Sequence, residues 1–571
     1  MSSNTDPAQA EAKSQPASTQ EQTDAHATER TAEPQAGYRF WLAFWSIALT
    51  NLAAAFDATT LSVALPKISS ELGGSSTEAF WAGTSYLLAT TAMMLIWVTV
   101  SDTLGRRIAI LTALVVFAAG AIICAVASNW TTMLAGRTIQ GVGCGGVVGL
   151  TVVLITDLVP LRRRGKLYAL ISVVWAVGGP IGPIIGGVLS QKGAWRWIFW
   201  MNLPIVAVGM AGIAVFLRLS HRQRAIGEAL RCFDFAGSAL FVASATALLM
   251  PITWGGTQYP WSSWQTLVPL LLGILGIVAF GFYEKWSQSR WPNISQLVPL
   301  NIFSNYSVLL LFACSTLHGL VLYSFVYYMP EYFQGVKLYS PIVSGVAALP
   351  QTVTIVPCAA FVGVVVGLTG RYRWAVWAGW LLVSGGCGLL VLLDAHTSVA
   401  QWIFLQAVSG LGIGLLFPSI SLAVQASVPE SSVSTAATLV LFFRSMGQAL
   451  GVAIGSAILE NQLRLRWEKI PGHELHGSGS KPGDIMALVS LLKQLPRDDP
   501  FTVHARDALA ASFQVIWIAS CAISGVCFLA MLPLKEYDMN REHASTQRFQ
   551  HDTAEQVKES KQDKRVMAAA H

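Results

Sequence analysis

The chain has 571 residues, of which 53% are hydrophobic and only 12% are charged. Soluble proteins carry about 25% charged residues, so this composition argues against a soluble fold and is typical of an integral membrane protein. The net charge of +6 does not predict nucleic-acid binding, because the Lys and Arg residues lie in short clusters between apolar runs rather than along one polar face.

Apolar runs that could cross a membrane recur along the whole chain. A bilayer core about 30 Å thick needs roughly 20 apolar residues per helix. The sequence therefore predicts an all-α polytopic membrane protein with fourteen transmembrane helices, near residues 40–62, 81–100, 108–128, 131–156, 168–189, 198–217, 236–253, 267–283, 307–329, 343–368, 374–393, 400–424, 435–458 and 510–533. Residues 1–38 precede these runs and are predicted to be disordered, because the first 37 contain no aromatic side chain.

Basic residues indicate how these helices are oriented. They gather in the loops after even-numbered spans, as with Arg106 and Arg107, the run from Arg162 to Arg164, and Arg371. The loops after odd-numbered spans, up to the eleventh, hold few of them. Because Lys and Arg in short loops resist translocation, both termini are predicted to be cytosolic.

An internal repeat predicts how the helices are grouped. One constant shift pairs glycines of the fourth and fifth spans with glycines of the twelfth and thirteenth: Gly141 with Gly410, Gly143 with Gly412, Gly145 with Gly414 and Gly178 with Gly447. Duplicated halves are common in transporters. The predicted division is an N-terminal six-helix bundle at 39–217, two linking helices with cytosolic loops at 218–306, a C-terminal six-helix bundle at 307–533 with an extracellular loop at 459–509, and a cytosolic tail at 534–571.

Short motifs on these spans resemble those of a known family. Asp102, Gly105, Arg106 and Arg107 are similar to the loop signature G-x-x-x-D-x-x-G-[RK]-[RK] of the major facilitator superfamily, although Val98 stands at its leading glycine. The fifth span resembles the glycine-proline signature that the family's antiporters carry, through Gly178, Gly179, Pro180, Gly182, Pro183, Gly186 and Gly187.

Other segments narrow this resemblance. The run from Arg137 to Gly143 is similar to the fourth-helix signature R-x-x-Q-G-x-G. The run from Asp57 to Pro66 resembles the first helix of the fourteen-spanner drug:proton antiporters, and residues 195–204 (WRWIFWMNLP) resemble the sixth-helix hallmark of the same group. Residues 328–350 and 370–374 resemble fungal members, which commonly export toxins, antifungals or secondary metabolites.

The resemblance implies a major facilitator fold and a proton antiporter that exports small amphipathic organic compounds. The expected partners are a small-molecule substrate, protons and the lipid bilayer. No cofactor, metal or nucleic acid is expected, and the protein is expected to be monomeric. The plasma membrane is the preferred location, and the vacuolar membrane is the alternative.

Three ionisable residues inside the predicted spans are candidates for proton coupling. Burying such a side chain in a bilayer costs at least about 2.5–3.5 kcal/mol, so each is first interpreted as functional. Asp57 and Arg137 lie at matching depths from the outer ends of their helices, which predicts a direct or water-linked pair. Asp57 would take up a proton when that contact loosens, and a purely structural ion pair is the alternative. His318, midway through the ninth span, is the third candidate, and a buried structural histidine is its alternative.

Other residues are candidates for the substrate cavity and for a conformational latch. Cavities of this kind are mostly apolar and aromatic, so the predicted lining is Gln140, Trp175, Tyr323, Phe325, Phe442, Phe443 and Arg444. Gln140 could instead join helices, and Arg444 is a lone cation that needs a carboxylate, carbonyls or an anionic substrate. The family resemblance implies a cytosolic latch between the halves, formed by Asp102, Gly105, Arg106, Arg107 and Asp157. The run from Arg162 to Arg164 is interpreted only as a topological signal.

Competing functions remain open at the level of sequence. A carrier of amino acids or other polar solutes would need more charge in its cavity than these spans contain. A non-transporting sensor on the same scaffold usually carries a large soluble tail, whereas residues 534–571 are few and charged. No paired carboxylates, His clusters or phosphate loop stand out in the sequence, which argues against an enzyme.

Overall fold

The computed structural model describes residues 37–73, 76–159, 161–217, 219–220, 233–255, 259–291, 296–429, 432–471, 485–539 and 548–549. Most of the predicted N-terminal segment and of the cytosolic tail therefore lies outside the described residues. Within them the chain is nearly all helical. Its single strand pairing joins β1 (Leu219–Ser220) to β2 (Arg548–Phe549) and brings the segment after the first bundle next to the tail.

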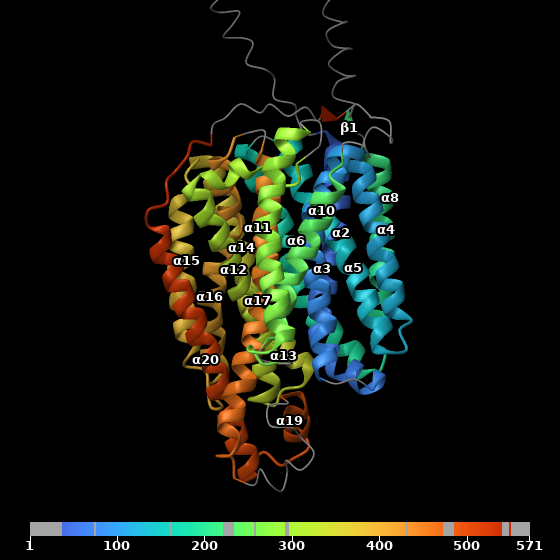
Figure 1. Ribbon diagram of the computed structural model, residues 1–571. Helices are drawn as coiled ribbons and strands as arrows, with labels where there is room; N and C mark the ends of the chain where they lie inside the picture. The colour runs from blue at the N-terminus through green and yellow to red at the C-terminus, as the bar shows by residue number, and fades with distance from the viewer. Residues whose placement is uncertain are drawn as a thin grey trace, which may run out of the picture.

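The N-terminal half contains six crossings within the described residues, and it is drawn from blue to teal in Figure 1. Its helices are α2 (Tyr38–Leu72), α3 (Ser76–Leu104), α4 (Arg106–Ala125), α5 (Trp130–Leu158), α6 (Leu161–Gln191), and the pair α7 (Trp197–Trp200) and α8 (Asn202–Phe216) that makes the sixth crossing. Asn129 starts α5 by accepting a hydrogen bond from the Thr132 amide at 2.8 Å.

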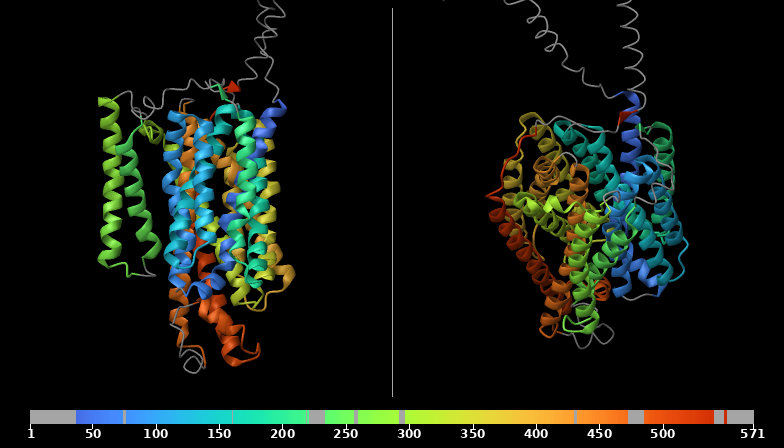
Figure 2. Two further views of the ribbon diagram at one scale, coloured as in Figure 1. Left: turned by 90° about the vertical axis from the view of Figure 1, so that its right-hand side faces the viewer. Right: turned by 45° about the horizontal axis from the view of Figure 1, so that its top comes forward.

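Two helices connect the halves, namely α10 (Phe235–Trp254) and α11 (Trp264–Arg290), followed by the 3-10 turn η2 (Leu300–Ser304). Figure 2 shows this pair standing at one side of the bundle. The helix α10 packs on α3 and α17, whereas α11 packs mainly on α10. The outer face of α11 exposes apolar side chains, among them Leu271, Leu275 and Phe282. So large an apolar surface is stable in lipid rather than in water.

The C-terminal half repeats the six-crossing arrangement. Its helices are α12 (Tyr306–Gly335), α13 (Pro341–Ala347) with α14 (Leu349–Thr369), α15 (Arg373–Leu390), α16 (Val399–Ser427), α17 (Val433–Trp467) and α20 (Pro500–Met531). The predicted loop at 459–509 is more helical than expected. In this segment α17 continues to Trp467, α19 (Ile485–Leu492) packs on α12, and α20 begins at Pro500, where Asp499 accepts a hydrogen bond from the Thr502 amide.

A helix lies at each of the fourteen predicted spans, but only thirteen helices among the described residues are long and apolar enough to cross a membrane. The remaining one is α15, which has 18 residues, begins with a charged Arg373 and carries three Trp residues. It nevertheless packs between α16 and α20 in the same way as its neighbours. The predicted class is confirmed: two six-helix bundles joined by two linking helices.

The two halves share one packing pattern, as the sequence repeat predicts. In the first half α5 packs on α3 and α4 while α2 packs on α6 and α8; in the second, α16 packs on α14 and α15 while α12 packs on α17 and α20. The paired glycines sit at equivalent contacts. Gly141 lies against α3 and Gly410 lies against α14. Likewise, Gly178 lies against α2 and Gly447 against α12. Within the described residues the halves meet mainly along two seams: α17 packs on α3 and α5, and α6 packs on α13 and α14.

The glycine stripe of α6 allows a close approach to α2. A Cβ atom placed on Gly178 would lie 2.6 Å from the Cβ of Ala55, and one on Gly186 would overlap the carbonyl oxygen of Thr60. In contrast, a Cβ on Gly179 would meet nothing within 4 Å. Small residues at every fourth position are the usual way for two membrane helices to pack closely.

We expect Gly186→Ala to lower thermal stability, because the added methyl group must push the α2 backbone away. Overpacking of this kind costs about 1–3 kcal/mol. Gly179→Ala is the matched control on the same helix and should leave the melting temperature unchanged or raise it through better helix propensity. Fluorescence-detected size-exclusion chromatography after heating measures both variants. Equal melting temperatures would show that the α2 contact is not tight.

Candidate transport site

A buried ion pair links α2 and α5 inside the N-terminal half. Arg137 Nη1 lies 2.6 Å from Asp57 Oδ2, and neither side chain is more than 1% exposed. The other carboxylate oxygen of Asp57 accepts hydrogen bonds from Gln140 Nε2 at 2.8 Å and from Asn202 Nδ2 at 3.2 Å. Both oxygens of Asp57 are therefore partnered, and a cation balances its charge, as a buried carboxylate requires.

Arg137 also binds groups on α3. Its Nε donates a hydrogen bond to the Ala82 carbonyl oxygen at 3.0 Å, and its guanidinium lies 4.2 Å from the centroid of the Tyr86 ring. The Tyr86 hydroxyl in turn donates to Cys144 Sγ at 2.9 Å. The network centred on Asp57 thus joins four helices of the first half: α2, α3, α5 and α8.

This network lies next to the C-terminal half. Gly83 follows the Ala82 carbonyl that binds Arg137, and a Cβ on Gly83 would lie 3.1 Å from the Tyr327 hydroxyl of α12. Tyr327 stacks on Tyr323 with ring centroids 6.0 Å apart. The residue that binds Arg137, Ala82, is therefore the direct neighbour of a residue at the contact between the halves, Gly83. A movement of Arg137 can be passed to this contact through one peptide unit.

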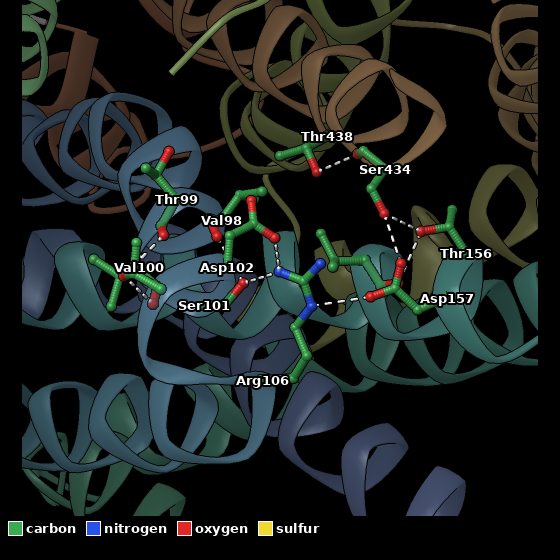
Figure 3. Close-up of polar contacts among 12 residues, drawn as sticks. Val98, Thr99, Val100, Ser101, Asp102, Arg106, Thr156, Asp157, Ser434 and Thr438 are labelled. Atoms are coloured by element: carbon green, nitrogen blue, oxygen red, sulfur yellow. Dashed lines mark hydrogen bonds and ion pairs between the residues drawn. The ribbon is translucent and has the colours of Figure 1, made fainter. Parts of the chain in front are cut away.

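A polar cluster near the α3–α4 turn connects the halves at a second place (Figure 3). Arg106 forms ion pairs with Asp102 and with Asp157, the latter with 2.9 Å between Nε and Oδ2. The other oxygen of Asp157 accepts a hydrogen bond from Ser434 Oγ at 2.9 Å, and Thr156 Oγ1 lies 2.8 Å from the same hydroxyl. Because Ser434 belongs to α17, this cluster crosses between the halves.

Two further residues of the predicted latch have different positions. Gly105 adopts a φ of 93° between α3 and α4, a conformation that only glycine adopts without strain, and the turn places Arg106 beside Asp102. Arg107 does not join the cluster. Its guanidinium donates a hydrogen bond to the Ala214 carbonyl oxygen of α8, within the same half.

Arg164 makes a further contact between the halves, so its interpretation as a purely topological signal was wrong. The side chain is only 3% exposed. Its Nη1 donates to Gln425 Oε1 of α16 at 3.0 Å, while Nε and Nη2 donate to the Val159 and Thr156 carbonyl oxygens. Gln425 Nε2 then donates to the Tyr168 hydroxyl at 3.1 Å. The side chains of the two preceding arginines lie outside the described residues.

The predicted antiporter helix, α6, contacts both halves. Gly182 belongs to the stripe that faces α2. On another face, Pro183 packs toward α13 of the opposite half, and a Cβ on Gly187 would lie 3.2 Å from the Ile342 amide nitrogen. The side chain of Pro180 lies outside the described residues. A helix with so little side-chain volume on two faces can seat closely against its own half and against the other one.

The aromatic residues predicted to line one cavity do not form one wall. Phe325 stacks on Trp517 of α20 at 5.3 Å between centroids, so it faces the interior of the C-terminal half. Phe442 lies 5.5 Å from Phe241 of α10 and faces the linking pair. The two rings thus face different helices, which the sequence could not indicate because α12 and α17 are apolar on most of their faces and periodicity then gives no direction.

Three other predicted lining residues have distinct surroundings. Phe443 stacks on Phe312 of α12 at 4.9 Å. Trp175 Nε1 lies 3.5 Å from Asn51 Oδ1, and it packs with Tyr323 in an apolar cluster drawn from both halves. Trp175 and Tyr323 therefore stay the aromatic candidates at the contact between the halves.

His318 and Arg444 lie together in the C-terminal half and not beside Asp57. The His318 ring meets the Phe417 ring edge-on at 5.9 Å, and the Arg444 guanidinium lies 4.2 Å from the centroid of the same ring. Sequence reasoning gave no role to Asn202, although it lies within the WRWIFWMNLP segment. The available signal was a single amide side chain within an apolar span.

Comparison with known proteins identifies a family and several similar proteins. The sequence profile of the Major Facilitator Superfamily matches residues 47–452. The MFS transporter L2 of Phoma sp. is 44% identical over 513 residues, which cover 89% of this chain and 84% of that protein. The MFS-type efflux pump LUC4 of Fusarium sp. is 39% identical over 77% of each chain. The Acurin A biosynthesis cluster MFS-type transporter of Aspergillus aculeatus is 35% identical over 90% of this chain and 92% of that protein.

A solved structure agrees with the fold. The human organic anion transporter MFSD10 (TETRAN) matches with a TM-score of 0.52 over 85% of this chain and 98% of that one, at 15% sequence identity. At this identity the likeness concerns the fold alone. The profile match, the relatives and the apolar helices together lead to one conclusion: the chain belongs to the major facilitator superfamily and is an integral, multi-pass membrane transporter.

Proposed function

We propose that this transporter exports small amphipathic organic compounds from the cytosol by proton antiport across the plasma membrane. The names of two relatives, an efflux pump and a transporter of a biosynthesis cluster, support export of a secondary metabolite. The low charge of the spans supports an amphipathic substrate. The observation that carries proton coupling is the buried carboxylate of Asp57, which is held by a cation and two amides on other helices.

Protonation of Asp57 is the coupling step in this proposal. The ionised carboxylate holds Arg137 through a direct ion pair. A neutral acid keeps hydrogen bonds but loses the attraction between opposite charges, so Arg137 is freed to shift toward its partners on α3, the Ala82 carbonyl and the Tyr86 ring. The helix α3 forms one of the two seams between the halves. Protonation thereby biases the relative position of the halves.

The latch determines which side is open. Asp157 with Ser434, and Arg164 with Gln425, tie the halves together at the end of the helices that the basic loops predict to be cytosolic. These contacts must break before the cavity opens to the cytosol and takes up substrate. Rocking of two such bundles exposes a central site alternately to each side. A proton entering from outside supplies the work, because each charge that crosses 100 mV releases about 2.3 kcal/mol.

The proposed substrate path runs along the contact between the halves. The candidate residues of its wall are Trp175, Tyr323 and Gln140. Asp57 and a ligand would compete for the hydrogen bond that the Gln140 amide donates. His318 and Arg444 are the polar candidates from the C-terminal half. In this proposal proton binding at Asp57 belongs to the first half, whereas both halves contribute residues to ligand recognition.

An export assay tests the function directly. A fungal strain that lacks the gene, the parent strain and an overexpressing strain are loaded with a panel of fluorescent amphipathic compounds. We expect accumulation to fall as gene dosage rises, and a protonophore should abolish this dependence. Accumulation that ignores both gene dosage and the protonophore would disprove proton-driven export. Accumulation that follows gene dosage but not the protonophore would disprove only the antiport mechanism.

A further inference from the structure

Arg444 of α17 and His318 of α12 converge on one residue of α16. The Arg444 guanidinium lies 4.2 Å from the centroid of the Phe417 ring, and its Nη2 donates a hydrogen bond to the Phe417 carbonyl oxygen at 3.1 Å. His318 Nε2 lies 3.3 Å from the Ile413 carbonyl oxygen, one turn earlier on α16. A Cβ on Gly319 would overlap the Arg444 backbone carbonyl, so α12 and α17 touch at this level.

Arg444 carries a buried charge without a counter-ion. The side chain is 3% exposed, no carboxylate among the described residues forms an ion pair with it, and its Nε has no hydrogen-bond partner. Arg137, at 1% exposure in the other half, has Asp57, an amide oxygen, a carbonyl and an aromatic ring around it. The two arginines are similarly buried, yet only Arg137 has its charge balanced. A guanidinium is expensive to bury unless an anion balances it.

His318 adds a second unused polar atom to the same place. The side chain is 1% exposed, and Nδ1 has no hydrogen-bond partner. Because Nε2 faces the Ile413 carbonyl oxygen, the neutral ring carries its proton on Nε2, and Nδ1 is left as an acceptor. The site therefore offers donors from a cation and one acceptor beside them, with the Phe417 ring as an apolar wall.

We propose that Arg444 and His318 recognise an organic carboxylate that carries an N–H or O–H group next to its acid function. The guanidinium pairs with the carboxylate, and His318 Nδ1 accepts the neighbouring hydrogen. Arginine suits this task because its planar donors match the two oxygens of a carboxylate. The inference rests on the proposed export function and deepens it, since it makes the substrates acidic amphipathic compounds.

Three dansyl compounds serve as probes. Dansylglycine carries a carboxylate next to a sulfonamide N–H, dansylglycinamide has no charge, and dansylsarcosine keeps the carboxylate but lacks the N–H. The purified full-length transporter is reconstituted into proteoliposomes, and transport of each probe against a pH gradient is measured by fluorescence. We expect the wild type to prefer dansylglycine over both other probes.

Arg444→Gln removes the charge but keeps an amide donor for the Phe417 carbonyl. We expect it to reduce dansylglycine transport by about 10- to 100-fold, the range for a hydrogen bond to a charged group, while dansylglycinamide transport changes little. Arg444→Lys should retain part of the preference for the acid. Melting temperatures of both variants separate a loss of recognition from a loss of folding.

His318→Phe provides an independent measurement. Phenylalanine keeps a ring against Phe417 but has no acceptor at the position of Nδ1. We expect this variant to transport dansylglycine and dansylsarcosine equally well, whereas the wild type should favour dansylglycine. A stably folded Arg444→Gln protein with an unchanged ratio of acid to amide transport would overturn the carboxylate site. Failure of the wild type to transport either the acid or the amide would instead count against the export function itself.

Discussion

Asp57→Asn is expected to abolish the response of transport to a proton gradient while substrate exchange continues. The asparagine keeps the shape of the carboxylate and can still accept hydrogen bonds from Gln140 and Asn202, but it cannot bind a proton. A carrier coupled to one proton can hold a substrate gradient of about 50-fold per 100 mV of driving force, and an uncoupled carrier holds none. Proteoliposomes with an imposed pH gradient measure the gradient, and counterflow measures exchange.

Two additional variants control this experiment. The single substitution leaves Arg137 buried without a counter-ion, which costs about 3–5 kcal/mol, so the double variant Asp57→Asn with Arg137→Gln tests coupling in a more stable protein. Glu71→Gln, on the same helix, is the matched control. Hydrogen bonds from Trp195 and Lys67 lower the pKa of Glu71, so this exposed carboxylate is charged at neutral pH but lies outside the network. Proton-driven accumulation by a folded Asp57→Asn protein would rule out the role of Asp57.

Gln425→Ala is expected to shift the transporter toward the state that is open to the cytosol. The substitution removes the acceptor of Arg164 Nη1 and the donor to the Tyr168 hydroxyl, and both partners then regain water only if the halves separate. A hydrogen bond to a charged group is worth about 1.5–3 kcal/mol, which corresponds to a change of about 10- to 100-fold in the ratio of the two states. Spin labels at the start of α6 and at the end of α16, close to Arg164 and Gln425, report the change as a longer distance by double electron-electron resonance.

Ser434→Ala is a second test of this prediction, and Ser427→Ala is its control. Ser434→Ala removes the hydrogen bond between Ser434 and Asp157, which also joins the halves, and should produce a shift in the same direction. The Ser427 hydroxyl donates to the Ala423 carbonyl oxygen of its own helix at 2.7 Å, so its loss should leave the distance distribution unchanged. An unaltered distribution in both Gln425→Ala and Ser434→Ala would mean that these contacts do not hold the cytosolic side closed.

The sequence predicted contacts best where they depend only on how far along its helix each residue lies. Depth along a helix follows from counting residues at a fixed rise, and this counting placed Asp57 and Arg137 at one level, where the structure has their direct ion pair. The repeat shift similarly located Gly141 and Gly410 against equivalent helices of the two halves. Both inferences need position along the chain and nothing else.

Predictions that require a direction around the helix axis were less successful. Phe325 points to α20 and Phe442 points to α10. Their directions could not be predicted, because a helix that is apolar on nearly every face gives no periodic signal. The inward direction of the Arg164 side chain was missed for a related reason. A basic residue at the start of a membrane helix satisfies the topology rule whether it faces water or a partner, and only the position of Gln425 on a distant helix distinguishes the two cases.

The hairpin of α10 and α11 makes the two seams between the halves differ in their exposure to lipid. It covers the line where α3 meets α17, whereas neither helix packs extensively on α6 or α14 within the described part of the chain. The other seam, where α6 packs on α14, has no comparable cover among the described helices, so lipid would contact that seam directly.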